Sequence, residues 1–312
     1  MSEPRVEWIA ADPASQRVLE LAERVASAAT NLLITGESGT GKDQLARSIH
    51  ERGAHRDAPY QKIDCASLPP DLVESELFGH ERGAFTGAVE TKRGRLELAG
   101  RGTLVLDEVA ALGLPAQAKL LRVLEERRFE HLGGTESLRM EARIIALTNS
   151  NLDRAVAGHR FREDLYFRLN VLAIEVPPLR NRTADILPLA DHFLRRLGPV
   201  HGRPEANLNA EAQAALTSYA WPGNVRELKN VLERALVFAQ QDVLSIADLP
   251  DSVRSARHSG ATPGNLPSLE QLEKEAIAAT LDATRYKISR AAEILGISRK
   301  TLLEKRKKYG LL

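Results

Sequence analysis

One stretch decides the fold of this chain: Asn31-Leu32-Leu33-Ile34-Thr35-Gly36-Glu37-Ser38-Gly39-Thr40-Gly41-Lys42-Asp43. Residues 31–35 predict a short buried strand, residues 36–43 a glycine-rich loop, and residues 44–52 the helix that follows it. In this context the glycines let backbone N–H groups face phosphate oxygens, and the helix N-terminus adds positive potential. The sequence therefore predicts a phosphate-binding loop.

The predicted loop supplies most of an ATP site. Lys42 is expected to neutralise the β- and γ-phosphates. Asp43 stands where the G-x-x-x-x-G-K-[ST] pattern has a hydroxyl that binds Mg²⁺, so the ligand role of position 43 stays open. The predicted nucleotide-binding residues of this loop are Gly36, Glu37, Ser38, Gly39, Thr40, Gly41, Lys42 and Asp43.

A second strand, predicted at residues 103–106, ends in two carboxylates. At the tip of a buried strand, Asp107 is the predicted partner of Mg²⁺, directly or through water. Glu108 is placed to polarise the attacking water. We therefore expect an ATPase with ATP and Mg²⁺ as its cofactors.

Strand and helix patterns alternate through the first part of the chain and become purely helical beyond Pro178. Strands alternating with helices favour a parallel sheet with helices on both faces, an α/β fold. Residues 254–267 are rich in Ser, Gly, Pro, Ala and Asn, which is typical of a flexible linker. The predicted domains are an α/β nucleotide-binding domain (1–177), a small all-helical lid domain (178–253), the linker (254–267) and a basic helical domain (268–312).

Composition limits the possible locations and partners. The chain has 43 basic and 42 acidic residues, so any affinity for nucleic acid requires a local patch. Cys65 is its single cysteine, which excludes an internal disulfide and fits a reducing cytosol. We expect a cytoplasmic protein without a membrane span. The histidines His131, His159 and His201 lack metal-ligand partners at useful spacing and are expected at the surface.

The local basic patch lies near the C-terminus, where residues 285–308 hold nine Lys or Arg and two Glu. Residues 288–295 predict a helix, Gly296 and Ile297 a tight turn, and Ser298 the N-cap of a second helix. This pattern is typical of a helix-turn-helix whose second helix enters the major groove of DNA. The predicted DNA-binding residues are Arg290, Ser298, Arg299, Lys300, Thr301 and Lys305.

Between the two ATP motifs lies a hexapeptide in which two glycines and two alanines leave Phe85 and Thr86 as the only side chains with reach. It reads Gly83-Ala84-Phe85-Thr86-Gly87-Ala88. The hexapeptide resembles the GAFTGA loop of the bacterial enhancer-binding proteins (NtrC family), which remodel RNA polymerase carrying the sigma-54 factor. The helix-turn-helix resembles the Fis-type module of the same family, so the resemblance covers nearly the whole chain. It implies that residues 83–88 contact sigma-54.

The resemblance also implies an AAA+ P-loop ATPase that assembles into a homo-oligomeric ring, a hexamer. Position by position, Asn149 resembles the residue that senses the γ-phosphate, and Arg226 the lid arginine that contacts nucleotide. Arg162 and Arg168 resemble the two arginines that reach into the neighbouring subunit's site. The family usually has Glu at position 43, so Asp43 supports the resemblance.

Two positions depart from the family pattern. The family usually has Asn where this chain has Asp64, and that Asn restrains the catalytic glutamate. A carboxylate at position 64 would repel Glu108 rather than simply hold it. At Glu304 relatives often have a basic residue, so the preferred DNA sequence is expected to differ.

The sequence thus predicts a transcriptional activator that binds double-stranded DNA upstream of sigma-54 promoters and converts closed polymerase complexes to open ones. Only about thirty residues precede the glycine loop, too few for a regulatory domain, so control is expected from a separate protein in trans, from expression level or from DNA-assisted assembly. The alternative is a DNA-binding regulator of ordinary polymerase whose ATPase domain serves only as a ligand or oligomerisation switch. A general protein-remodelling ATPase is a third class, but it would not need the basic helix-turn-helix.

Overall fold

The computed structural model describes residues 8–255, residues 287–310 and, between them, residues 273, 274, 277, 278, 280, 281 and 284. The chain divides into two compact units, residues 1–257 and residues 258–312. In the part of the chain that is described, no helix is long and apolar enough to cross a membrane.

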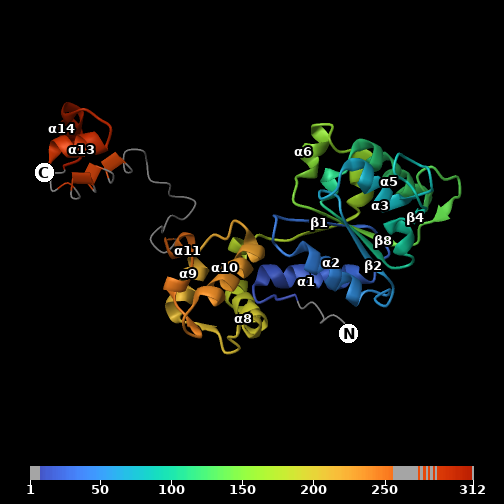
Figure 1. The fold of residues 1–312 in the computed structure, drawn as a ribbon, viewed down its shortest axis with the longest axis horizontal. Coiled ribbons are helices and arrows are strands. Elements are labelled where there is room, and N and C mark those ends of the chain that lie inside the picture. The colour runs from blue at the N-terminus through green and yellow to red at the C-terminus, as the bar shows by residue number, and fades with distance from the viewer. Residues whose placement is uncertain are drawn as a thin grey trace. The chain divides into compact units, whose positions relative to one another are not determined.

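A five-stranded parallel sheet forms the centre of the first unit, with strand order β2-β5-β8-β1-β9 (Figure 1). Because all five strands are parallel, their carboxyl ends meet at one edge, where Asp107 ends β5 while the phosphate loop and Asn149 follow β1 and β8. The strands are β1 (Leu32–Thr35), β2 (Tyr60–Asp64), β5 (Thr103–Asp107), β8 (Arg143–Thr148) and β9 (Leu172–Glu175).

Both faces of the sheet are covered, as a parallel sheet requires. Side chains alternate between faces, so in β5 Val105 packs with α1 and α2, while Leu104 and Leu106 pack with α3 and α5. The helices of these layers are α1 (Pro13–Ala26), α2 (Lys42–Arg52), α3 (Pro70–Phe78), α4 (Arg95–Leu98), α5 (Leu114–Glu126), α6 (Leu152–Ala157) and α7 (Glu163–Leu169), with the 3-10 turn η1 (Val109–Ala111). Two short antiparallel pairs lie outside the central sheet: β3 (Gly79–His80) with β4 (Lys92–Arg93), and β6 (Arg128–Phe129) with β7 (Leu138–Arg139). A single bridge joins His80 to Leu132.

A helical subdomain follows the sheet and has its own core around the fully buried Trp221. The prediction of an all-helical region was wrong in one detail, because two-residue strands β10 (Asn207–Leu208) and β11 (Val243–Leu244) pair in parallel there. They are too short for a periodic signal in the sequence. The helices are α8 (Ile186–Leu197), α9 (Ala210–Ser218), α10 (Asn224–Phe238) and α11 (Asp251–Ser255), with the 3-10 turns η2 (Leu179–Asn181), η3 (Thr183–Asp185), η4 (Pro199–His201) and η5 (Ile246–Asp248).

The second unit contains the helix pair α13 (Ile288–Ile294) and α14 (Arg299–Lys308). Ala291 and Ala292 are buried against Leu302, so small side chains let the helices approach closely, as predicted. The linker predicted at residues 254–267 lies, from residue 256 onward, outside the described residues. The predicted domain limits stay predictions.

Candidate functional site

The phosphate loop joins β1 to α2 and depends on glycine at two places. Gly39 has φ +78°, and a Cβ there would lie 2.4 Å from the carbonyl oxygen of Gly223. Gly36 has φ +146°, and a Cβ there would lie 2.6 Å from the carbonyl oxygen of Val176. Only glycine combines these backbone angles with such close approach. The loop is therefore shaped by both the sheet domain and the helical subdomain.

Lys42 is buried at the start of α2, with its side chain folded back over the loop. Its Nζ donates to the carbonyl oxygens of Gly36 (2.7 Å) and Glu37 (3.1 Å). Burial lowers the pKa of Lys42, while the carboxylates of Glu108 and Asp107 act in the opposite direction. A cation held in a glycine loop in this way is placed to meet phosphate oxygens.

Lys62 on β2 joins Asp43 and Asp107 through its ammonium group. The sequence had not predicted this residue at the site. The Lys62 Nζ lies 2.5 Å from Asp43 Oδ1 and 2.8 Å from Asp107 Oδ2. Burial opposes the charged form, but the hydrogen bonds to Asp107 and Asp43 raise the pKa of Lys62 overall. The two carboxylates thus converge on one point, which fits the oxygen ligands that Mg²⁺ prefers.

Glu108 follows β5 in the left-handed region of backbone space, with φ +50°. Its Oε2 accepts a hydrogen bond of 3.0 Å from the backbone N–H of Asn149, which follows the neighbouring strand β8. Non-glycine residues rarely adopt such angles, and they gather at functional sites. The sheet therefore brings together the two residues that the sequence assigned to catalysis and to γ-phosphate sensing.

Asp64 ends β2 in register with Asp107, but its carboxylate turns to its own loop, where Oδ1 accepts from the backbone N–H of Ala66 (2.9 Å). Among the hydrogen bonds of the described residues, Glu108 is restrained by Asn149 and not by Asp64. The repulsion expected between the two carboxylates stays a prediction.

The helical subdomain contacts the phosphate loop through Glu37. The Arg180 guanidinium donates to both oxygens of this carboxylate (2.5 and 2.8 Å), and Asn224 Nδ2 donates to one of them (3.1 Å). Hydrogen bonds from Arg180 and Asn224 lower the pKa of Glu37 to about 2. Sequence reasoning missed Arg180 and Asn224. The feature of the sequence that could have indicated them is Glu37, since an acidic side chain inside a phosphate loop favours a cationic neighbour.

Further contacts fasten the same junction. Arg226, predicted to bind nucleotide, donates from Nη1 to Ser38 Oγ (2.8 Å), and its backbone N–H reaches the carbonyl of Gly39. Arg182, also missed from the sequence, is 2% exposed and donates from Nη2 to the carbonyl of Thr40 (2.6 Å). Movement of the subdomain would therefore move the phosphate loop itself.

Arg162 is the N-cap residue of α7, and Arg168 lies in the last turn of that helix. The Arg162 guanidinium forms a two-point ion pair with Asp164 (3.0 and 2.7 Å), and Arg168 Nη2 donates to the carbonyl of Leu124 (3.2 Å). In the described part of the chain, neither arginine has a hydrogen bond or ion pair with its own phosphate loop. Their expected role in a neighbouring site stays a prediction.

The hexapeptide at residues 83–88 forms an exposed turn between β3 and β4. Gly83 N–H donates to the carbonyl of Ala88 (2.9 Å), and Ala88 N–H to that of Phe85 (3.0 Å). Gly83 and Gly87 have φ +85° and +109°. Phe85 is 40% exposed and its ring forms a T-shaped contact with that of His80, and Thr86 is exposed.

His131 lies at the base of this turn, and its prediction as a surface residue was wrong. The side chain is only 12% exposed, with Nδ1 2.7 Å from Glu81 and Nε2 3.0 Å from Glu97. Burial favours the neutral ring, but both carboxylates together raise the pKa of His131. The partners are 50 and 34 residues away in sequence, so spacing alone could not reveal them.

In the second unit, Ser298 caps α14 as predicted, its Oγ accepting from the backbone N–H of Thr301 (3.0 Å). Arg299 and Lys300 are exposed at the start of that helix. Lys305 is instead half-buried and paired with Glu273, and Arg290 is paired with Glu293 (2.7 Å). Among the described residues, Arg299 and Lys300 are thus exposed cations without an ion pair, whereas Arg290 and Lys305 are each paired with a carboxylate.

Comparison with known proteins covers each part of the chain. Residues 8–175 match the family described as Sigma-54 interaction domain, residues 180–266 the AAA+ ATPase lid domain, and residues 268–309 the Bacterial regulatory protein, Fis family.

Individual relatives are similar over nearly the whole chain. The alginate biosynthesis transcriptional regulatory protein AlgB of Pseudomonas aeruginosa is 46% identical over 299 residues, which are 96% of this chain and 66% of AlgB. The regulatory protein AtoC of Escherichia coli is 41% identical, over 96% of this chain and 67% of AtoC. A crystal structure of NtrX from Brucella abortus in complex with ADP has a TM-score of 0.74 and 34% identity, covering 98% of this chain and 70% of that one. The chain spans about two thirds of the length of the curated relatives it matches.

Proposed function

This chain belongs to the sigma-54-dependent bacterial enhancer-binding proteins, with an AAA+ ATPase domain, its lid and a Fis-type DNA-binding module, and we propose that it hydrolyses ATP to remodel sigma-54 polymerase. The observation that carries the proposal is the convergence of Lys42, Asp107 and Glu108 at one edge of the sheet, while Thr86 is exposed on a separate turn. ATP hydrolysis and the contact with sigma-54 are then carried out by different parts of one domain.

The phosphate loop binds the nucleotide phosphates through its backbone N–H groups and Lys42. Asp107, with Asp43 near it, would hold Mg²⁺, which when bound neutralises charge on the β- and γ-phosphates. Lys62 would then leave the point between the two carboxylates, because a divalent cation offsets their charge in its place. The oxygen donors of this site fit that ion.

Glu108 orients and polarises the attacking water, as its carboxylate is fixed by the backbone N–H of Asn149. That fixed geometry makes Asn149 sensitive to whatever occupies the γ-phosphate position, since both residues leave adjacent strands at the same edge. Arg162 and Arg168 act on the site of the next subunit in a ring, where an arginine stabilises charge on the transferred phosphoryl group.

The output passes through residues 83–88, which engage sigma-54, while the C-terminal module binds double-stranded DNA upstream of the promoter. Support comes from the exposed Phe85 and Thr86 on a turn closed by two glycines in left-handed conformations. The exposed cations Arg299 and Lys300 at the start of α14 support the DNA contact.

The test separates ATP turnover from output in the full chain. Thr86→Ala should keep ATP turnover within a few-fold of the parent, because no hydrogen bond of the described residues joins residue 86 to the phosphate loop. The same variant should fail to bind sigma-54 in the presence of a transition-state analogue of ATP hydrolysis, and should fail to form open complexes. Glu90→Ala, an exposed change on the same segment, serves as the matched control and should keep both properties. Open complexes formed by Thr86→Ala at the parental level would refute the role assigned to the turn.

A further inference from the structure

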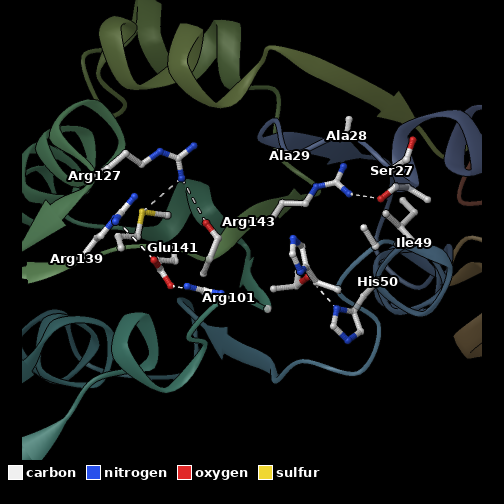
Figure 2. Close-up of a pocket in the computed structure, with 18 residues that line it drawn as sticks. Ser27, Ala28, Ala29, Ile49, His50, Arg101, Arg127, Arg139, Glu141 and Arg143 are labelled. Carbon is white, nitrogen blue, oxygen red and sulfur yellow. Dashed lines mark hydrogen bonds and ion pairs between the residues drawn. The ribbon is translucent and has the colours of Figure 1, made fainter.

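A large pocket lies at the opposite end of the sheet from the phosphate loop. It has a volume of about 520 Å³ and is lined by the ends of α1 and α2, the starts of β5 and β8, and residues 139–142 (Figure 2). Pockets for small molecules typically measure about 300–1,000 Å³. Strand β5 begins in the pocket at Thr103 and ends at Asp107, so roughly 13 Å of extended chain separates the pocket from the ATP site.

The pocket walls carry an excess of positive charge. Four arginines, Arg101, Arg127, Arg139 and Arg143, line it, against one carboxylate, that of Glu141. His50 adds no charge near neutral pH, because burial lowers its pKa. Four guanidinium groups and one carboxylate leave three uncompensated positive charges in the lining. An anion is the ligand that such a wall attracts.

Among the described residues, the hydrogen bonds of two of these arginines go to neutral acceptors. The half-buried Arg143 guanidinium donates to the carbonyls of Val25 (2.8 Å), Ala26 (3.1 Å) and Thr30 (3.2 Å). Arg127 Nη1 donates to the carbonyl of Ala142 (3.4 Å) and faces the sulfur of Met140. Their charges are therefore positioned by the backbone without being cancelled by a carboxylate.

The other two arginines share one carboxylate. Arg101 Nε lies 2.9 Å and Arg139 Nε 3.7 Å from opposite oxygens of Glu141. Both side chains are largely exposed, at 77% and 79%. Figure 2 shows Arg101, Arg139 and Glu141 together on one side of the pocket, with Arg127 beside them. Glu141 is a single-charge partner that a more highly charged anion can displace.

We propose that this pocket is a second ligand site, which binds a small phosphorylated molecule of about nucleotide size. The planar guanidinium fork matches two oxygens of a phosphate group, and a pair of arginines on one wall can take a diphosphate. The opposite wall, with Ala28, Ala29 and Ile49, offers apolar surface to the uncharged part of the ligand. The site is separate from the phosphate loop, so both can be filled at once, and the inference does not depend on the proposed ATPase function.

The test is calorimetric titration of the full chain with one equivalent of ADP, which fills the phosphate loop and leaves little free ADP to compete for the pocket. Inorganic phosphate and pyrophosphate probe the phosphate-binding wall alone, and guanosine 5′-monophosphate adds an uncharged part to a single phosphate. We expect one saturable site per chain for pyrophosphate. Tighter binding of the nucleotide than of inorganic phosphate would support recognition of the organic part by the apolar wall, and equal binding would overturn that part of the proposal.

Two sets of substitutions should change pyrophosphate affinity in opposite directions. Arg101→Gln with Arg139→Gln should weaken pyrophosphate binding by at least about tenfold, because two charge-assisted contacts are lost. Glu141→Gln should strengthen binding, because the competing carboxylate is removed. The charge-matched control, Arg122→Gln with Arg195→Gln, removes two exposed arginines on α5 and α8 that pair with Glu126 and Asp191 outside the pocket. All these side chains are exposed, so the variants should fold, which an unchanged thermal midpoint would verify.

Two results would overturn the site. One is the absence of saturable pyrophosphate binding to the parent loaded with one equivalent of ADP. The other is an equal loss of binding in the pocket double variant and the charge-matched control, which would reduce the effect to overall charge.

Discussion

Glu37 shows how one residue of the phosphate loop depends on a distant element. Its carboxylate is separated from Arg180 by 143 residues in sequence, yet receives both donors of that guanidinium. A bidentate pair of this kind fixes the relative orientation of its two side chains. It contributes little to the free energy of unfolding, because the side chains of Glu37 and Arg180 are 42% and 44% exposed and water screens their charges. Its main effect is to orient the helical subdomain on the loop.

This pair makes stability depend on pH at the acid end. The folded pKa of Glu37 is about 2 and its ordinary value 4.5, so its contribution is complete above about pH 4.5 and disappears as the pH falls toward 2. Glu37→Gln should therefore lower the thermal midpoint at pH 6, by no more than the equivalent of about 1 kcal/mol given the screening. The difference from the parent should shrink as the pH approaches 3, because protonated Glu resembles Gln. Calorimetric melts of both proteins at matched ionic strength measure this, and a difference that is constant with pH would contradict the linkage.

Lys62 gives a second prediction at the residue scale. With no divalent cation, its ammonium is the positive charge between Asp43 and Asp107. Lys62→Met should leave two carboxylates facing each other and lower the thermal midpoint of the metal-free protein. Added MgCl₂ should then raise the midpoint of the variant more than that of the parent, since the ion takes the place that Lys62 held. NaCl at the same ionic strength is the control, and an equal response of both proteins to MgCl₂ would count against the arrangement.

At the scale of elements, the sequence was most informative where a pattern is local. The strand β1, the glycine loop and α2 occupy contiguous residues, and the parallel sheet followed from alternation of strands and helices. The capping of α14 by Ser298 was equally local. The contacts of Arg180, Asn224 and Lys62 were not predictable, because each partner is distant in sequence and is brought near only by the fold. His131 was misjudged for the same reason.

The helix pair α13 and α14 supports a prediction about how DNA is contacted. Arg299 is exposed in the first turn of α14, so Arg299→Ala should cost about 1–3 kcal/mol in specific binding if the side chain reads a base. A preference at one operator position should then relax. A contact to phosphate would instead weaken binding equally for all sequences and reduce the salt slope by about one. Binding curves on cognate and substituted DNA at several salt concentrations distinguish the two, and unchanged binding would remove Arg299 from the interface.

At the scale of the whole molecule, the proposed ring would bring Arg162 and Arg168 of one subunit to the ATP site of the next. Arg162 and Arg168 make their described contacts to Asp164 and Leu124, away from the phosphate loop. Lys42 would neutralise the β- and γ-phosphates from within the chain, and in the proposed ring an arginine of the next chain would add stabilisation of charge on the transferred phosphoryl group. The proposed assembly would therefore be part of the chemistry and would make turnover depend on protein concentration.

That dependence is testable with subunit mixing. Arg162→Ala should reduce ATP turnover by about 10³-fold or more, with nucleotide binding largely kept, because an arginine donated in trans stabilises the transition state. Lys42→Ala should be inactive because its own phosphate loop fails. Mixing the two inactive proteins should restore some turnover, at interfaces where the intact Lys42 of one subunit meets the intact Arg162 of the other. Asp164→Ala is the matched control, since it breaks the same ion pair within the chain but leaves the arginine. If Asp164→Ala were as inactive as Arg162→Ala and mixing restored nothing, the loss would be structural, and each chain would have to complete its own site.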